Sequence, residues 1–467
     1  MALYEPATEE EVATVLTAFR QGNMPSGYVI NLTWTPVVWK ILPGPVIPPP
    51  WSDAEKVLLD SRLDAVESRI DGSLKADGTL KETVVTRAAL DVSVAAALVT
   101  TAPGKTALLY PEHLRRWRAK LAATAYRRAV ITAMGDSITW GWFANSDGSA
   151  NAGTVSQADI RQYGYVGTLR RLMASKYGDV GEGCIINRDT RVTSSGSVVN
   201  ETSFGPTTAG RRVGQGATLT YALPVCTDIV IYAWWQGSSN NAAWTYTIDG
   251  GSAVTVNGPG GSDVLYEVAI TGLADTTHTL VINGPATASR TADIAMVGAY
   301  RGAGGVVVNR FAEPGKQLKD HFGSTGIFGT RQLASTFGRT NTDLILLAYN
   351  TNESSISGQA GGATPEQYRT YAQKVIDYAI TINADVLLVA GPRQDLASVG
   401  AIPQQAWIDV MVDLAKTNDR VAVLDLAQVW GAKIAAQADG LMADSQHPNI
   451  LGHADYGRLI YDAIGGV

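Results

Sequence analysis

Short apolar runs alternate with amphipathic stretches from residue 128 onward, except in one middle segment. Runs of this kind, bounded by glycine and polar residues, are typical of parallel strands covered on both faces. Thr364 and Pro365 carry the start signals of a helix whose apolar stripe extends from Tyr368 to Ala379. The repeated order of strand and helix predicts a doubly wound α/β sheet that binds ligands at the carboxyl ends of its strands. The predicted strands are AVITAMG, VVVNRF, DLILLAY, DVLLVAG and VAVLDLA.

The rhythm changes between residues 187 and 301, where apolar residues alternate with polar ones at a period of two. Runs such as TLTYAL, DIVIYAWW and HTLVIN, separated by turn residues, predict an antiparallel β-sandwich inserted into the α/β domain. The segment is similar to jelly-roll modules that often bind carbohydrate. Strand aromatics usually belong to a core, but Trp234, Trp235 and Trp244, with Tyr246, are also candidates for stacking on sugar rings.

The amino-terminal quarter predicts a docking module followed by a helical linker. An amphipathic stretch from Glu9 to Arg20 and a β-rich piece from Tyr28 to Leu42 precede a proline-rich spacer that ends at Pro50. Residues Leu59 to Ile70 have heptad spacing over about two heptads, which fits either a short trimeric coiled coil or a plain amphipathic helix. The predicted domains are 1–50 for docking, 51–125 for the linker, 126–186 with 302–467 for the α/β fold, and 187–301 for the sandwich.

Composition narrows the class of protein. The chain has 467 residues, of which 45% are hydrophobic and 17% charged, and its net charge is −6. These values predict several folded domains. No long run of one charge is present, so we expect no nucleic-acid partner. No apolar stretch reaches the length of a membrane span, and the acidic amino terminus lacks a secretory signal pattern. Cys184 and Cys226 fit two buried thiols, with a disulfide as the alternative.

Two segments carry candidate catalytic residues. In ITAMGDSITWGW, Ser137 follows a predicted strand at a glycine turn, where its hydroxyl lies at the carboxyl edge of the sheet. In LMADSQHPNILG, Asp444 precedes His447 by three residues, so its carboxylate can hold one imidazole nitrogen while the other faces a cleft. An activated serine needs this combination of base and orienting acid. The other four histidines lack this context, and we assign them structural roles.

Two further loops follow strands and offer hydrogen-bond donors. Asn350 and Asn352 come after DLILLAY, where a side-chain amide can stabilise an oxyanion, although an Asx turn explains the same residues. Gly315 follows VVVNRF, and its backbone N–H is a second candidate donor or simply part of a turn.

These four segments, in this order, resemble the conserved blocks of the SGNH (GDSL-like) serine hydrolases. The resemblance implies a three-layer, flavodoxin-like sheet with Ser137 as nucleophile, His447 as base and Asp444 as orienting acid. It also implies an oxyanion hole made of the Ser137 N–H, the Gly315 N–H and the Asn352 side chain, without metal or cofactor. The third block departs from the family's Gly-x-Asn-Asp, since Asn350-Thr351-Asn352-Glu353 stands there, and Asn350 is therefore an alternative to Asn352.

The layout resembles that of bacteriophage minor tail proteins. It predicts an esterase that deacylates a cell-envelope polysaccharide or glycolipid. We expect a homotrimer, made in the host cytoplasm, that is joined to other tail proteins of the virion through its amino-terminal region. The alternatives are a receptor-binding tail protein with an inactive hydrolase domain and a cytosolic lipase or thioesterase.

Overall fold

The computed structural model divides the chain into two compact units, Met1–Leu90 and Asp91–Val467. It describes residues 107–145, 157–201, 206, 209–261, 264–322, 337–355, 362–392, 402–431 and 433–465, with two short strands before them. Those strands, β1 (Tyr28–Ile30) and β2 (Ile41–Pro43), pair antiparallel within the predicted β-rich piece. The amphipathic stretch at 9–20, the prolines at 45–50 and the heptad spacing at 59–70 lie outside the described residues.

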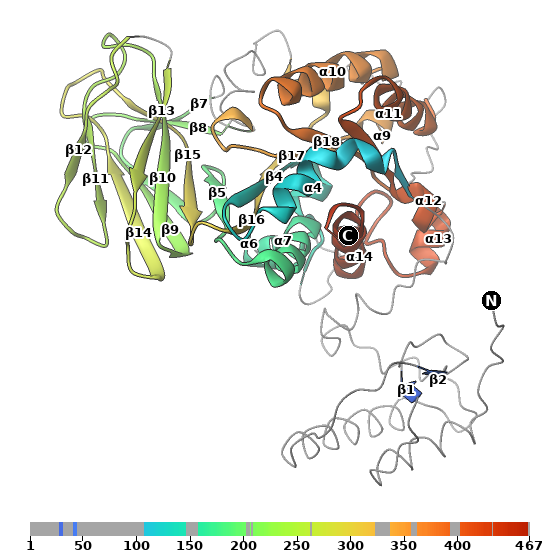
Figure 1. Cartoon of the computed structure of the whole chain (residues 1–467). Helices are drawn as coiled ribbons and strands as arrows, with labels where there is room; N and C mark the ends of the chain where they lie inside the picture. Colours follow the sequence, from blue (N-terminus) through green and yellow to red (C-terminus); the bar gives the residue numbers. More distant parts are fainter. Residues whose placement is uncertain are drawn as a thin grey trace, which may run out of the picture. The chain divides into compact units, whose positions relative to one another are not determined.

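A six-stranded sheet forms the centre of the α/β domain (Figure 1). Five strands are parallel, and their order places the first of them between the second and the third, as in flavodoxin-like folds. A two-residue strand adds antiparallel at the far edge. In spatial order the strands are β16 (Gly305–Ala312), β4 (Arg128–Gly135), β17 (Leu344–Ala348), β18 (Asp385–Ala390), β19 (Val421–Asp425) and β3 (Leu108–Leu109).

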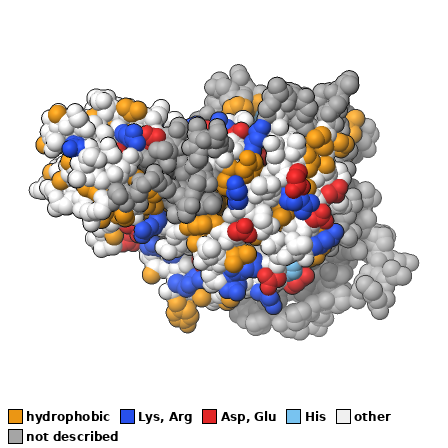
Figure 2. All heavy atoms as spheres, turned by 90° about the horizontal axis from the view of Figure 1, so that it is seen from above, with side chains coloured by type: hydrophobic (Ala, Val, Ile, Leu, Met, Phe, Trp, Pro, Cys, Tyr) orange, Lys and Arg blue, Asp and Glu red, His pale blue; other side chains and the backbone are white. Residues whose placement is uncertain are grey.

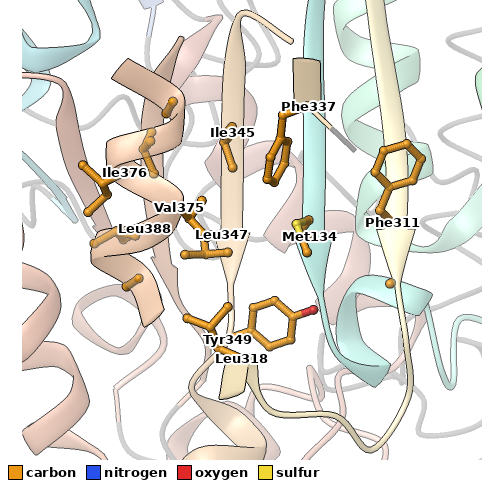
Figure 3. Packing of buried hydrophobic residues seen from close by; sticks show 14 of the residues in the cluster. Met134, Phe311, Leu318, Phe337, Ile345, Leu347, Tyr349, Val375, Ile376 and Leu388 are labelled. Carbon is orange, nitrogen blue, oxygen red and sulfur yellow. The ribbon is translucent and has the colours of Figure 1, made fainter. Parts of the chain in front are cut away.

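Helices cover both faces of this sheet, as alternate residues of β17 show. Ile345 and Leu347 pack in one apolar cluster with residues of α10 and α11, whereas Leu344 and Leu346 pack in another with α7 and α14. Figure 3 shows the first cluster, in which the α10 side chains lie against the strands. The helices are α4 (Arg115–Ala122), α5 (Ser137–Trp140), α6 (Gln157–Tyr163), α7 (Tyr165–Tyr177), α9 (Thr351–Ser355), α10 (Pro365–Thr381), α11 (Gln405–Thr417), α12 (Leu426–Trp430), α13 (Lys433–Ala438) and α14 (Ile450–Ile464), with 3-10 turns η2 (Pro111–Leu114) and η5 (Leu318–His321).

The mixed α/β prediction is confirmed, and helix α10 begins where the sequence places it. Thr364 accepts a hydrogen bond from the Gln367 N–H, and the Gln367 side chain returns one from the Thr364 N–H. The predicted stripe faces the core, with Tyr368 and Ala379 buried and Tyr371 partly buried.

The predicted linker ends earlier than residue 125. Strand β3 pairs with β19, and the Trp117 side chain in α4 is fully buried. The Trp117 indole N–H donates to the Ile464 carbonyl at 2.9 Å, and its backbone N–H donates to Asp385 at 2.9 Å. Residues 107–125 therefore belong to the α/β domain, whose edge strand and one covering helix they supply.

Two antiparallel sheets form the inserted sandwich and enclose an apolar core of their own (Figure 1). One contains β13 (Val264–Ile270), β10 (Asp228–Trp235), β15 (Ala292–Tyr300), β8 (Gly210–Val213) and β7 (Val198–Glu201), with β5 (Gly183–Ile186) also paired to β15. The other contains β12 (Val254–Val256), β11 (Trp244–Ile248), β14 (Thr276–Asn283), β9 (Thr218–Cys226) and β6 (Val192–Ser195).

The sandwich begins before the predicted boundary at residue 187. Strand β5 pairs antiparallel with β15, so Gly183 is the first strand residue of the sandwich sheet. The apolar run of β5 has no alternation, because its side chains are buried on both sides between the sandwich and the α/β domain. A period-two pattern therefore could not mark it as part of the sandwich.

Charged side chains of both signs are interspersed on the face that Figure 2 shows. Among the described residues, no helix is both long and apolar enough to cross a bilayer.

Candidate active site

Three of the segments with candidate residues leave the sheet at one point. In β4, Gly135 pairs with Ala312 of β16 and with Ala348 of β17. The loops that carry Ser137, Gly315 and Asn352 thus begin side by side at the carboxyl ends of adjacent parallel strands. Gly135 is required there, because a Cβ would lie 1.9 Å from the Thr139 Oγ1 and 2.8 Å from the Ala348 oxygen.

Ser137 is the first residue of the short helix α5. Asp136 precedes it as the helix cap and accepts a hydrogen bond from the Ile138 N–H at 2.9 Å. Gly141 ends the helix at a φ of 99°, a left-handed conformation that favours glycine. Burial raises the pKa of Asp136 to about 6. The strand, the cap and the glycine together fix the position of the Ser137 hydroxyl.

Ser137, His447 and Asp444 form a continuous chain of hydrogen bonds. The Ser137 Oγ lies 2.9 Å from the His447 Nε2, although the two residues are 310 positions apart. The His447 Nδ1 lies 2.9 Å from one Asp444 oxygen and 3.1 Å from the other. A proton on Nδ1 is donated to Asp444, which leaves Nε2 free to accept the serine proton. The Ser137 and His447 side chains are almost fully buried.

A tight turn holds the acid in place. The Asp444 Oδ1 accepts hydrogen bonds from the backbone N–H groups of Gln446 at 2.7 Å and His447 at 2.6 Å. Burial opposes ionisation of Asp444, but the hydrogen bonds from His447 and from these backbone groups outweigh it and lower the pKa of the carboxyl. Asn449 then caps α14 through the N–H groups of Leu451 and Gly452. The aspartate is therefore ionised and fixed before any substrate arrives.

Two aromatic rings beside His447 were not predicted from the sequence. The ring centroids of Trp142 and Phe143 lie 5.5 Å and 5.2 Å from that of His447. The Trp142 carbonyl accepts a hydrogen bond from the His453 Nε2 at 2.7 Å. Burial lowers the pKa of His453 to about 4, so this second histidine is neutral and structural. In the sequence, the position of Trp142 and Phe143 directly after the α5 segment could have indicated that they lie near Ser137.

The loops around Gly315 and Asn352 are joined by hydrogen bonds. The Asn352 amide donates to the Lys316 carbonyl at 2.9 Å, and the Gln317 amide donates to the Asn352 carbonyl at 3.1 Å. The Leu318 N–H donates to Glu353 at 2.7 Å. Gly315 has a φ of 76°, and a Cβ added there would meet open space. Within the described residues, the N–H groups of Ser137 and Gly315 have no hydrogen-bond partner.

The contacts distinguish Asn352 from the alternative, Asn350. The Asn350 side-chain oxygen accepts the Gly391 N–H at 3.0 Å and ties β17 to the end of β18. Its amide nitrogen is buried and has no hydrogen-bond partner in the described part of the chain. Asn352 is 9% exposed and lies against the Gly315 loop. The Asn350 side chain thus links two neighbouring strands, whereas that of Asn352 reaches the Gly315 loop.

Glu353 occupies the last position of this block in a fully buried environment. Burial raises its pKa to about 8. The carboxyl is consequently protonated near neutrality, which removes the cost of burying a charge while one oxygen still accepts the Leu318 N–H. The Glu353 side chain, which is longer than that of an aspartate, thus reaches the neighbouring loop and accepts a hydrogen bond from it.

The tryptophans proposed to stack on sugars are core residues. The exposed fractions of Trp234, Trp235 and Trp244 are 4%, 7% and 2%, and Tyr246 is buried as well. Gly258 lies against the Trp235 ring, where a Cβ would approach within 2.2 Å. Trp234 packs in the apolar cluster of the α/β domain, Trp244 packs in the core of the sandwich, and the Trp235 indole N–H donates to the Gly261 carbonyl at 3.1 Å. The sugar-binding assignment of these residues is therefore wrong.

The remaining candidate residues have structural surroundings. Cys184 and Cys226 are free, buried thiols and do not form a disulfide. Burial lowers the pKa of His321 to about 3, and its Nε2 lies 2.6 Å from the Tyr349 hydroxyl. No group of three or more His, Cys, Asp or Glu side chains in the described ranges is placed to hold a metal ion.

Comparison with known proteins identifies solved structures with a similar fold. No protein-family model and no curated protein sequence matches the chain. Its structure is similar to that of a peptidoglycan O-acetylesterase, with a TM-score of 0.56 and 17% identity over 77% of this chain and 99% of the other. A Bacillus subtilis protein (TM-score 0.28, 14% identity, 59% and 88% covered) and a family two carbohydrate esterase from Cellvibrio japonicus (0.26, 13%, 60% and 97%) are more distant. The first likeness supports the fold over about three quarters of the chain.

Proposed function

We propose that this chain is a serine esterase that removes acyl groups, above all acetyl groups, from a cell-envelope polysaccharide or glycolipid. The observation that supports this proposal is the hydrogen-bonded series from Ser137 through His447 to Asp444. A nucleophile, a base and an orienting acid in this order can carry out acyl transfer.

The reaction proceeds in two steps. His447 takes the Ser137 proton at Nε2 as the Ser137 oxygen attacks the ester carbonyl, and it gives this proton to the departing alcohol. The acyl group then remains on Ser137. His447 next takes a proton from water, whose oxygen attacks the acyl carbon, and returns it to Ser137 as the carboxylic acid leaves. Asp444 keeps the Nδ1 proton in place and stabilises the imidazolium in both steps.

We assign the oxyanion to three donors: the Ser137 N–H, the Gly315 N–H and the Asn352 amide. The three loops begin at one sheet position, and both backbone groups lack a partner within the described residues. The Asn352 amide donates to the Lys316 carbonyl and is thereby held beside the Gly315 loop. A side-chain donor in this role contributes about 3 to 4 kcal/mol to the transition state.

The substrate assignment rests on the fold and on how the sandwich meets the catalytic loops. The similar structure is named as a peptidoglycan O-acetylesterase. Arg188, just after β5, forms an ion pair with Glu313 at 3.0 Å, and the Glu313 N–H donates to the Gly135 carbonyl at 3.1 Å. The segment after β5 therefore contacts the loop that carries Gly315, which brings the sandwich next to the catalytic loops.

A reporter assay tests the proposed activity. We expect the purified chain to hydrolyse p-nitrophenyl acetate and to react with a fluorophosphonate probe at Ser137. Ser137→Ala should lower kcat at least about 10⁴-fold, since the nucleophile is lost. Ser195→Ala, a change on an exposed strand of the sandwich, serves as the matched control and should retain full activity. A folded wild-type chain that neither hydrolyses nor labels would show a receptor-binding protein with an inactive hydrolase domain.

Acyl-chain preference tests the substrate class. We expect acetate to be released from O-acetylated polysaccharide, and activity on p-nitrophenyl esters to fall as the acyl chain lengthens. A preference for long acyl chains or for thioesters would instead favour the lipase or thioesterase alternative.

We further propose that the protein acts as a trimeric tail component of a virion. The support for this is the sequence pattern of residues 1–106, above all the heptad spacing from Leu59 to Ile70. A mass measurement in solution on the full chain, compared with a chain that begins at Asp91, tests the trimer. Equal oligomeric states would remove the heptad segment as its cause.

A further inference from the structure

A small cavity lies where the sandwich meets the α/β domain, away from the triad. Its volume is about 20 Å³, which is enough for one water-sized occupant. Arginines and acids from β16, α6, α7 and the segment around β5 surround it. The charged residues of the lining are Arg161, Arg170, Arg191, Arg310, Glu182 and Asp189.

Positive charge exceeds negative charge in this lining. Arg191 binds both acids, with distances of 2.6 Å to Glu182 and 2.9 Å to Asp189. Arg161 lies 3.1 Å from Asp189, and Arg170 lies 3.5 Å from Glu182. Three arginines thus share two carboxylates. Within the described residues, Arg310 has no carboxylate partner at all, so four guanidinium groups face two acids.

Arg310 differs from the other three arginines because its guanidinium has no carboxylate partner among the described residues. One of its nitrogens donates to the Trp140 carbonyl at 3.1 Å, and its guanidinium carbon lies 5.1 Å from the centre of the Trp140 ring. A guanidinium has five N–H donors, and the others have no acceptor among the described residues. Burial lowers the pKa of Arg310 to about 10, which still leaves it charged at neutral pH.

The occupant must therefore accept hydrogen bonds and carry negative charge. A water molecule accepts hydrogen bonds but leaves the excess positive charge of these partly buried arginines uncompensated. Cys184, which also lines the cavity, does not supply the charge, because burial raises its thiol pKa to about 12.

We propose that this cavity binds a small monovalent anion, chloride in solution, with Arg310 as its principal ligand and Arg161 and Arg170 beside it. The anion offsets charge at the junction of the two domains. Arg310 also holds the carbonyl of Trp140, the last residue of helix α5, so the site supports the element on which Ser137 lies. The proposal does not depend on the esterase activity.

Thermal unfolding of the full chain in sodium chloride and in sodium gluconate of equal ionic strength tests the site. A ligand that binds only the folded chain stabilises it with the logarithm of its concentration, so we expect Tm to rise by about 2 °C per tenfold increase of chloride above its Kd. Arg310→Met should abolish the difference between the two salts. Arg301→Met, which removes a partly exposed arginine outside the cavity, should retain it.

Bromide in crystals of the wild-type chain gives a second measurement that needs no variant to fold. We expect an anomalous peak in the cavity beside Arg310. A cavity that holds only water in bromide, or equal Tm values in chloride and gluconate, would overturn the proposal. Neither result would bear on hydrolysis by Ser137.

Discussion

At the scale of single residues, one oxygen of Asp444 accepts two backbone hydrogen bonds in addition to its contact with His447. Oδ1 accepts the backbone N–H groups of Gln446 and His447, whereas Oδ2 makes the shorter contact, 2.9 Å, with the His447 Nδ1. An asparagine at this position keeps its oxygen on the backbone donors and therefore turns its NH₂ toward Nδ1. The imidazole must then carry its proton on Nε2, where it cannot accept from Ser137.

Asp444→Asn should consequently lower kcat by about 10³- to 10⁴-fold while leaving Tm nearly unchanged. The measurement is p-nitrophenyl acetate hydrolysis together with thermal unfolding. Asp413→Asn, a change of an exposed helical acid, is the control. Activity within a few-fold of wild type would show that Asp444 does not orient the base.

Glu353 predicts a pH dependence of stability. Its pKa is about 8 in the folded chain against an ordinary value of 4.5, so the folded state holds a proton that the unfolded state releases. The stabilisation is fully present below pH 4.5 and is lost as the pH rises toward 8. Glu353→Gln keeps an oxygen for the Leu318 N–H without a titrating proton, and should flatten the curve between these limits by on the order of a few kcal/mol. Unfolding free energies measured across this range check it; identical curves would contradict the assignment.

Residue identity alone predicted the triad but not every role. Ser137, Asp444 and His447 had a recognisable spacing, whereas Asn350 and Asn352 were equally plausible in the sequence. The bond of Asn350 to the Gly391 N–H and that of Asn352 to the Lys316 carbonyl distinguish them, and both depend on which strands lie next to β17.

At the scale of elements, helix α10 illustrates how a local signal fixes a boundary. The reciprocal hydrogen bonds between Thr364 and Gln367 satisfy two backbone N–H groups that the first turn would otherwise leave free. Thr364→Ala should reduce the free energy of unfolding by about 1 kcal/mol, because one of these bonds is lost. Thr370→Ala in the middle of the same helix should change it by less. Urea unfolding of both variants measures the difference, and an equal effect would show that the cap contributes nothing specific.

At the scale of the whole molecule, the segment before β4 completes the α/β domain. Trp117 fills the space between α4 and α14, and β3 closes the edge of the sheet at β19. A chain that begins at Ala125 should lose at least about 3 kcal/mol of stability, as expected from deletion of a buried tryptophan. A chain that begins at Asp91 should unfold at the temperature of the full-length domain. Calorimetry on both chains tests this, and equal Tm values would return residues 107–125 to the linker.

The sequence by itself determined the order of strands and helices, the start of α10, the existence of an inserted β-domain and the residues of the triad. These follow from local periodicity, capping and spacing, which a linear pattern records. The tertiary structure decided that β5 joins the sandwich, that residues 107–125 join the α/β domain, and that the three tryptophans lie in the core. It also placed Arg310 beside a cavity with excess positive charge. Each of these depends on neighbours far apart in the chain, and burial by such neighbours leaves no periodic mark on the sequence.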